Sequence, residues 1–164
     1  MVMLKKYELT EQHPDTGLYC IKALRDFGNV AKGDIGGWIE GEKNLSHEGY
    51  AWVYGDAWVY GNARVSGNAR VYGDAEVSGN ARVYGDAWVS RAKHTSNVWT
   101  MTLGKHTITV DGDYLNIGCE SHTIKQWLKN FRKIGEMAGY SPEEIERYGD
   151  AITMINKWLK ADGS

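Results

Sequence analysis

A six-residue pattern of hydrophobic and polar positions runs through the middle of the chain. Valine recurs at every sixth position from Val53 to Val89, and alanine follows four residues after each of these valines from Ala57 to Ala87. Glycine and then asparagine or aspartate fill the positions between them. Because side chains alternate across a strand, each valine should face one side and its two neighbours the other. The pattern therefore predicts one short strand and one tight turn per hexapeptide, with valine in a packed interior and Gly-Asn or Gly-Asp at the corner.

A short fixed period of this kind indicates a solenoid. The stretch from Val53 to Ser90 resembles the hexapeptide-repeat left-handed β-helix family, in which three hexapeptides make one triangular coil of about 18 residues. It departs from that family in one respect, since Tyr or Ser follows the valine and the small Gly comes one place later. The resemblance implies a left-handed β-helix of about three coils, with residues 33–51 as a degenerate first coil. In that coil, apolar bulk is expected from Ile35, Trp38, Ile39 and Leu45, and corners from Gly36, Gly37 and Gly41.

Non-repetitive segments flank the repeats. At the N-terminus, Lys6–Leu9 and Leu18–Leu24 are predicted strands, joined by a turn-rich loop at residues 13–17. We expect this hairpin to cap the first coil, because the end of a solenoid exposes strand edges and apolar core.

A different pattern follows the repeats. After a polar linker at residues 91–97, alternating positions predict strands at 98–103, 106–110 and 114–117. Two helices come next, because Thr123 and Gln126 form a capping box, Gly139 ends the first helix, and Ser141 precedes the second. Their apolar stripes must pack on the three strands, on the β-helix or on a second subunit. These stripes consist of Ile124, Trp127, Leu128, Phe131 and Ile134 in the first helix and Ile145, Tyr148, Ile152, Ile155 and Leu159 in the second. The expected fold class is mainly β, with an N-terminal β cap (1–32), a left-handed β-helix (33–91) and a C-terminal β-strand and helical-hairpin region (92–164).

Composition and charge exclude several classes of protein. The net charge of −2 argues against a general nucleic-acid binder. The chain has no apolar run long enough for a membrane span and no N-terminal leader pattern, so we expect a soluble, cytoplasmic protein. Cys20 and Cys119 lack metal-type spacing and are expected to be free thiols. The basic patch of the first helix is expected to be a solvated face, with nucleic acid as the alternative partner, and comprises Lys125, Lys129, Arg132 and Lys133.

Function has to lie in the outward positions of the coils. Residues 18 apart are predicted to stack on one face, about 4.8 Å apart, which gives three ladders. The first contains Trp52, Arg70 and Trp88 beside Tyr54, Tyr72 and Ser90; the second contains Trp58 over Glu76 and Tyr60 over Ser78; the third contains Arg64 over Arg82 and Ser66 over Tyr84.

Each ladder has more than one interpretation. In the first, a guanidinium between two indoles forms a cation–π sandwich, which serves either surface packing, an oligomer interface or the stacking of a planar ligand. In the third, two stacked guanidiniums repel each other unless solvent, a carboxylate or a phosphate-like anion lies between them. The carboxylate would come from a cap, a tail or a neighbouring subunit. At the corners, Asp56 should stack over Asp74 and Asn62 over Asn80, with side chains bonded to their own backbone rather than to a metal ion.

Catalysis is the minority hypothesis. Hexapeptide-repeat β-helix proteins include acyltransferases and γ-class carbonic anhydrases, and the latter need three histidines around a metal. The repeats from 53 to 90 contain no histidine and run without interruption, and no nucleophile or phosphate-loop motif is present. We therefore expect no enzyme activity, no metal and no cofactor, with ordinary structural roles for His47, His94, His106 and His122.

A second resemblance suggests a biological setting. The segment G-D-I-G-G-W-I-E-G-E-K-N-L-S-H-E-G at 33–49, the V-Y-G-D-A-W repeats and H-T-I-K-Q-W at 122–127 are similar to small accessory proteins encoded by phages and prophages. This likeness implies a phage setting without an assigned activity or ligand. The β-helix resemblance implies a homotrimer with grooves between subunits.

These observations favour a non-enzymatic binding module. It would capture a host protein or a small anionic, nucleotide-like ligand in aromatic and arginine grooves, for instance to blunt a host defence. One alternative is an assembly protein that uses the β-helix as a rigid spacer, and a second is a hexapeptide-type acyltransferase. The candidate ligand-binding residues are Arg64, Arg82, Arg70, Trp52, Trp88, Trp58, Tyr54, Tyr72 and Tyr84.

Overall fold

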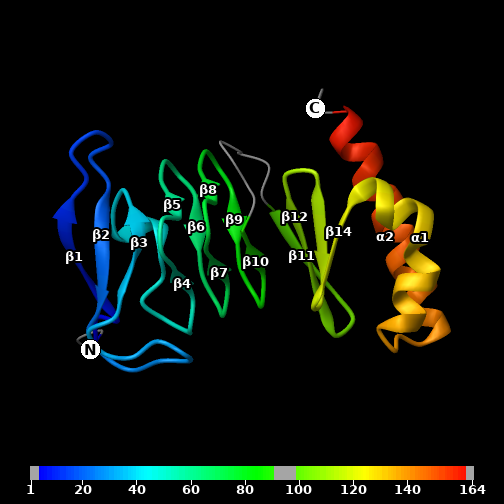
Figure 1. The fold of residues 1–164 in the computed structure, drawn as a ribbon, viewed down its shortest axis with the longest axis horizontal. Helices are drawn as coiled ribbons and strands as arrows, with labels where there is room; N and C mark the ends of the chain where they lie inside the picture. The colour runs from blue at the N-terminus through cyan, green and yellow to red at the C-terminus, as the bar shows by residue number, and fades with distance from the viewer. Residues whose placement is uncertain (1–3, 91–98, 162–164) are drawn as a thin grey trace.

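A computed structural model describes residues 4–90 and 99–161 of the chain. The molecule is elongated, with an N-terminal set of strands at one end, short strands in the middle, and a C-terminal sheet and two helices at the other end (Figure 1). The polar linker predicted at 91–97, together with Val98 and His94, lies outside the described residues.

The repeat region, residues 52–89, forms seven two-residue strands. They are β4 (Trp52–Val53), β5 (Trp58–Val59), β6 (Arg64–Val65), β7 (Arg70–Val71), β8 (Glu76–Val77), β9 (Arg82–Val83) and β10 (Trp88–Val89). Each of β4 to β7 pairs in parallel with the strand 18 residues later, which gives the rows β4-β7-β10, β5-β8 and β6-β9. All seven valines are at most 1% exposed, which confirms that they face the interior. The glycine that follows each strand has a φ between +55° and +68°, a conformation that glycine adopts without a steric penalty.

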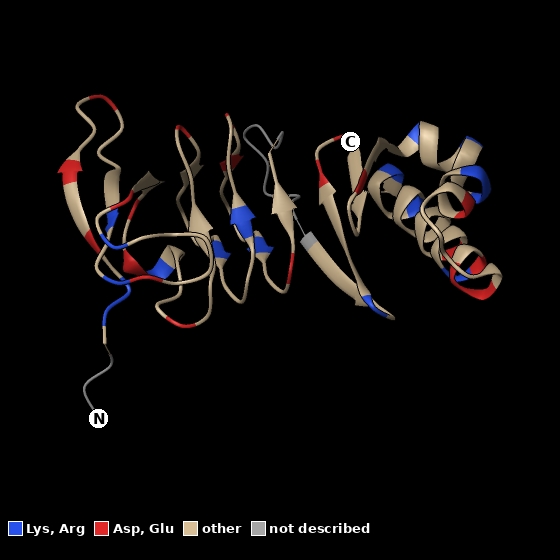
Figure 2. Cartoon of the chain, turned by 60° about the horizontal axis from the view of Figure 1, so that its bottom comes forward, with Lys and Arg blue, Asp and Glu red and all other residues tan. Residues whose placement is uncertain are grey.

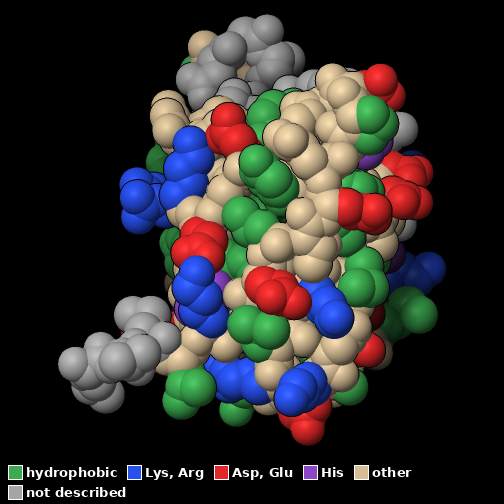
Figure 3. Space-filling model, turned by 90° about the vertical axis from the view of Figure 1, so that its left-hand side faces the viewer, with side chains coloured by type: hydrophobic (Ala, Val, Ile, Leu, Met, Phe, Trp, Pro, Cys, Tyr) green, Lys and Arg blue, Asp and Glu red, His purple; other side chains and the backbone are tan. Residues whose placement is uncertain are grey.

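The N-terminal strands cover the first end of the repeat region. They are β1 (Tyr7–Gln12), β2 (Tyr19–Ala23) and β3 (Ile35–Ile39). β1 and β2 form the predicted hairpin, β3 runs antiparallel to β2, and β3 also pairs in parallel with β5. Charged side chains of both signs and scattered hydrophobic ones cover this end of the molecule (Figure 3). Such a mixed surface suits a cap that hides apolar core from water.

The segment before the repeats is less regular than the repeats themselves. Trp38 pairs with Trp58 and Leu45 with Val65, so the register here advances by 20 residues rather than 18. A one-turn 3₁₀ helix, η1 (Glu42–Asn44), lies in this segment, and the buried Asn44 amide donates to the carbonyl oxygens of two repeat corners.

Two expectations for this segment are wrong. Ile35 is 61% exposed and adds nothing to the core, whereas Ile39 and Leu45 are buried as expected. Gly36 lies within β3 rather than at a corner, as does Gly37. A Cβ on Gly36 would lie 2.6 Å from Cγ1 of Ile21, so this glycine permits a close approach between strands.

The C-terminal sheet continues the row β6-β9. Its strands are β11 (Trp99–Leu103), β12 (His106–Asp111), β13 (Tyr114–Ile117) and β14 (Glu120–Thr123). They form an antiparallel meander, and Trp99 pairs in parallel with Arg82 of β9. The sequence patterns predicted three of these strands and missed β14, because Glu120–Thr123 is polar and only half-buried and so lacks a hydrophobic alternation.

The helical hairpin packs on this sheet and not on the repeat region. It consists of α1 (Ile124–Met137) and α2 (Pro142–Ala161). The Thr123–Gln126 capping box forms as predicted. The Nε1 atom of Trp127 donates to the Leu115 carbonyl at 2.6 Å, which fixes α1 against β13. A second core joins the two layers and includes Ile108, Val110, Leu115, Ile117, Trp127, Tyr148, Ala151, Ile152 and Ile155. Of the three predicted docking surfaces, the strands are the one used.

Two smaller expectations concern the cysteines and the membrane. Cys20 is buried, Cys119 is exposed, and both are free thiols. Within residues 4–90 and 99–161, no helix has the length and apolar character needed to cross a bilayer.

Candidate functional site

The three rows of the repeat region form three faces, and each places predicted ladder residues differently. The first face, on β4, β7 and β10, holds a shallow hollow lined by Asn29, Tyr54, Arg70, Tyr72 and Trp88. The Arg70 guanidinium carbon lies 5.7 Å from the Trp88 ring centre, so one half of the predicted cation–π sandwich is present.

Trp52, the other expected half of that sandwich, is not available to a ligand. It is only 1% exposed, and its ring meets Phe27 at 5.3 Å and Tyr7 at 6.1 Å between ring centres. The prediction that Trp52 binds a ligand is therefore wrong. The N-terminal cap covers this outward position, and the repeat pattern alone gives no sign of that cover.

The second face brings together aromatic and acidic side chains. Trp58 stacks in register over Glu76, as predicted, and also pairs with Trp38 of β3. His13, from the β1–β2 loop, lies 5.0 Å from the Trp38 ring centre and 5.8 Å from that of Trp58. Sequence reasoning missed Trp38 and His13 as site residues. The similarity of W-I-E at 38–40 to the W-V-Y repeats was the available signal for Trp38, whereas nothing in the sequence marked His13.

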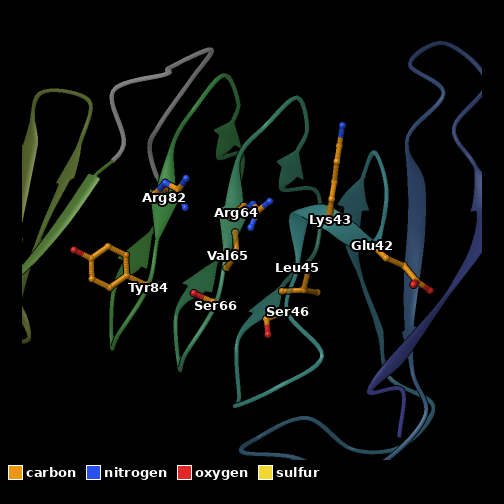
Figure 4. Close-up of a pocket in the computed structure, with 9 residues that line it drawn as sticks. All are labelled: Glu42, Lys43, Leu45, Ser46, Arg64, Val65, Ser66, Arg82 and Tyr84. Carbon is orange, nitrogen blue, oxygen red and sulfur yellow. The ribbon is translucent and has the colours of Figure 1, made fainter. Parts of the chain in front are cut away.

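The third face carries the two stacked arginines. Arg64 and Arg82 are direct register partners on β6 and β9, and both are exposed. Their side chains extend from neighbouring strands in the same direction (Figure 4). Lys and Arg occur on neighbouring repeat strands, whereas several Asp and Glu lie at turns (Figure 2). In residues 4–90 and 99–161, neither guanidinium has a carboxylate partner within ion-pairing distance.

A hollow of about 390 Å³ surrounds this arginine pair, and we call it the Arg64–Arg82 hollow. It is lined by Glu42, Lys43, Leu45, Ser46, Arg64, Val65, Ser66, Arg82 and Tyr84. A second depression on the other side of the same arginines is lined by Lys43, Asn62 and Asn80. The Asn62 amide donates to the Asn80 side-chain oxygen at 3.5 Å, which agrees with the predicted stacking of these corners.

The acidic residues near the arginines are already engaged elsewhere. Glu42 accepts a hydrogen bond from Lys5 at 2.6 Å, and this contact is the main reason that the pKa of the Glu42 carboxyl lies below its ordinary value. Glu40 pairs with Lys43 at 3.1 Å. The cap therefore does not supply the carboxylate that one interpretation of the arginine pair required.

Tyr84 forms one wall of the Arg64–Arg82 hollow. Its hydroxyl donates to the Thr100 carbonyl oxygen at 2.7 Å, while the residue remains 42% exposed. The hydrogen bond fixes the ring from the C-terminal sheet, so its position depends on a part of the chain outside the repeats. An anion with an attached planar group would find fixed cations and a fixed aromatic face in one hollow.

The remaining polar residues do not form a catalytic or metal centre. Within the described ranges, no group of three or more His, Cys, Asp or Glu side chains is placed to hold a metal ion. His47 stacks on Tyr7 in the cap, and burial lowers the pKa of its imidazole. His106 packs beside Tyr140, and His122 pairs with Glu120 at 3.0 Å. The basic residues of α1 are exposed, and Arg132 pairs with Glu146 of α2.

Comparison with known proteins bears on the repeat region alone. A family model described as YdcK Beta solenoid repeat matches residues 63–77 and 75–91. No curated protein matches the chain. The matched model describes a structural repeat and gives no sign of catalytic activity. Together with the parallel rows of short strands, this match identifies the chain as a β-solenoid repeat protein.

Proposed function

We propose that this protein is a non-enzymatic binding module that holds a small phosphate-bearing, nucleotide-like anion in the Arg64–Arg82 hollow. The observation that carries the proposal is the pair of exposed guanidiniums in direct register, with no carboxylate partner in the described ranges. Two such charges one strand apart repel each other, and an anion between them removes that repulsion. Arginine suits this role because its planar fork donates two parallel hydrogen bonds to a phosphate.

The surroundings of the arginines support a phosphate rather than a lone chloride-sized ion. Lys43 adds a third cation, and Ser46 and Ser66 line the same hollow with hydroxyl groups. Tyr84 offers an exposed aromatic ring on which a base can stack. The hollow, of about 390 Å³, has room for a mononucleotide-sized ligand.

Isothermal titration calorimetry at low ionic strength tests this proposal, with pyrophosphate and adenosine diphosphate as probes. The double variant Arg64→Gln/Arg82→Gln is expected to weaken binding by more than about tenfold, since charge-assisted hydrogen bonds contribute about 1.5–3 kcal/mol each. Arg70→Gln is the matched control, because it removes one arginine from a different face and should leave binding unchanged. Equal affinity of the parent protein and the double variant would refute the site.

We also propose finer features of the solenoid, namely left-handed winding in about three coils and assembly as a homotrimer. The six-residue period and the β-helix resemblance support them. Exposed aromatic side chains on the solenoid faces add support for assembly, since Tyr84 is 42% and Trp88 is 48% exposed. Sedimentation equilibrium at micromolar concentration should give the mass of three chains, and a monomer would contradict the assembly.

The phage or prophage setting, a role against host defence and a cytoplasmic location belong to the same proposal. They rest on the likeness of residues 33–49, the repeats and residues 122–127 to phage-encoded accessory proteins. Capture of a small signalling nucleotide would suit such a role, because sequestration needs affinity and no chemistry.

A second candidate function is assembly, with the solenoid as a spacer and the helical hairpin as a docking element. Its support is the exposure of apolar side chains on the helices, where Met137 is 81% and Trp158 is 52% exposed. The same double variant separates the two functions. A partner that docks on the helices should bind equally well when Arg64 and Arg82 are replaced.

A further inference from the structure

The second face of the solenoid contains a hollow with a character opposite to that of the arginine site. We call it the Trp38–Trp58 hollow, and it is lined by His13, Trp38, Asp56, Trp58, Asp74 and Glu76. Trp38 and Trp58 are register partners on the parallel strands β3 and β5, so their indoles leave the sheet on one face, one strand apart. Both side chains are half-buried, which leaves part of each ring open to solvent.

His13 closes one side of this hollow. Its ring meets Trp38 at an interplanar angle of 85° and Trp58 at 64°, so it touches both indoles without lying flat on either. The contact ties the β1–β2 loop to the first strands of the solenoid. The two indoles are therefore held at a fixed separation by the backbone pairing on one side and by His13 on the other.

The charge in the hollow has a single sign. Three of the six lining residues carry carboxylates, and none is Lys or Arg. Asp56 and Asp74 occupy equivalent corners 18 residues apart, and both are exposed. Glu76 follows Trp58 in the same row, one strand further along the solenoid. A ligand that enters between the indoles therefore meets aromatic faces and a negative field together.

We propose that the Trp38–Trp58 hollow binds an organic cation, specifically a quaternary or methylated ammonium group. Indole faces attract such cations, and the attraction is strongest where the cation leaves water. The carboxylates supply the long-range charge without forming a metal site, because the described ranges contain no group of three or more acidic or His side chains placed for a metal ion. The hollow, of about 380 Å³, is large enough for a trimethylammonium group with a short tail. This site lies on a different row of strands from Arg64 and Arg82 and does not depend on the anion proposal.

Choline and its neutral isostere 3,3-dimethyl-1-butanol form the decisive pair of probes, because they share a shape and differ in charge. Binding is followed through the indole N–H signals in ¹H–¹⁵N NMR spectra. Choline should shift the signals of Trp38 and Trp58 saturably and bind at least about fivefold more tightly than the isostere, since a cation–π contact contributes about 0.5–2 kcal/mol. Equal binding of the two probes, or no saturable shift, would overturn the proposal.

Variants assign the effect to the hollow. Trp58→Leu should abolish choline binding, and Trp88→Leu on the first face is its matched control and should leave it intact. Asp74→Asn changes an exposed corner and therefore keeps the fold, so it remains informative if Trp58→Leu fails to fold. It should weaken choline binding several-fold and leave the isostere unaffected. Unchanged choline affinity in Asp74→Asn and in Trp58→Leu would place the binding elsewhere and refute the site.

Two further arms distinguish the source of the cation and the competing occupant. Tighter binding of a trimethyllysine peptide than of the same unmodified peptide would assign the hollow to a protein ligand, whereas preference for choline would assign it to a small molecule, and both results support the ammonium chemistry. The competing occupant is the basic face of a second copy of this chain. If Arg64→Gln/Arg82→Gln dissociates an oligomer and choline binds only to that variant, the hollow is an interface and the proposal fails.

Discussion

At the residue scale, Lys6 is the most unusual side chain in the described structure. It is fully buried at the base of the N-terminal cap, although lysine is almost never fully buried without a partner. Its Nζ atom donates to the Ala51 carbonyl at 2.7 Å and lies 5.0 Å from the centre of the Phe27 ring. Burial, and then the nearby Arg25 charge, lower the pKa of Lys6 to about 8. The cap thus contains an amine whose charge is lost on folding in mildly alkaline solution.

This burial predicts a pH-dependent stability. Between about pH 8 and pH 9 the unfolded chain keeps Lys6 protonated, while the folded protein releases the proton. Because the unfolded state then binds more protons, the free energy of unfolding should rise with pH in this window. Lys6→Met should lack that rise.

Urea unfolding at a series of pH values measures both proteins. The raised pKa of the Cys20 thiol opposes the trend once the unfolded thiol ionises, near pH 9. It does so equally in the parent protein and the variant, so the difference between them isolates Lys6. Parallel pH profiles would show that Lys6 keeps its ordinary pKa in the fold.

At the scale of the repeat element, the corner glycines decide how closely the turns of the solenoid stack. Gly67 has a φ of +68°, and a Cβ there would lie 2.9 Å from the backbone nitrogen of Gly85, in the next turn. Gly55 has a φ of +55° and nothing within 4 Å of the same position. The two glycines share the backbone requirement, and only the first has a neighbour directly above it. Their comparison separates conformational strain from steric contact.

Alanine substitutions at these two corners test that distinction. Gly55→Ala should lower the free energy of unfolding by about 1–2 kcal/mol, the cost of a left-handed backbone in a residue with a Cβ. Gly67→Ala should lose clearly more, since Gly85 must also move. Thermal and urea unfolding give both values on the same scale. Equal losses would mean that the turns separate easily and that stacking at the corners contributes little.

At the scale of the whole molecule, the solenoid and the C-terminal sheet are joined by side chains that cap an open strand edge. The carboxylate of the fully buried Asp111 accepts a hydrogen bond from the backbone N–H of Ser90 at 2.9 Å. The Asn116 amide donates to the Trp88 carbonyl at 2.9 Å. These bonds satisfy backbone groups of β10 that would otherwise lie at the edge of its row. The solenoid therefore ends against the C-terminal sheet.

Removing one of these bonds should loosen the junction. Asp111→Ala is expected to cost about 1.5–3 kcal/mol, because a hydrogen bond to a charged group is lost and the Ser90 amide loses its acceptor. Hydrogen exchange at the Ser90 amide should become faster in this variant. Asp150→Ala, at an exposed position of α2, is the control and should change neither quantity. Unchanged protection of Ser90 would show that the junction relies on other contacts.

Much of the fold follows from local patterns in the sequence. The period of six determined where the short strands lie, and the alternation of side chains determined that Val53 and its equivalents point inward. The capping box at Thr123 determined the start of α1. In the site, the spacing of 18 placed Arg64 beside Arg82 before any coordinate was known. These features depend on residues that are close in sequence or related by a strict repeat.

The tertiary structure decided what covers each face. Trp52 and Trp58 are equivalent in the repeat, yet the cap buries Trp52 and leaves Trp58 open beside His13. It also decided that the helical hairpin packs on β12 and β13. A repeat pattern fixes the direction in which a side chain points, because strand geometry is local. It does not determine which non-repetitive segment packs over that side chain, because such contacts join residues distant in sequence through non-directional burial of apolar surface.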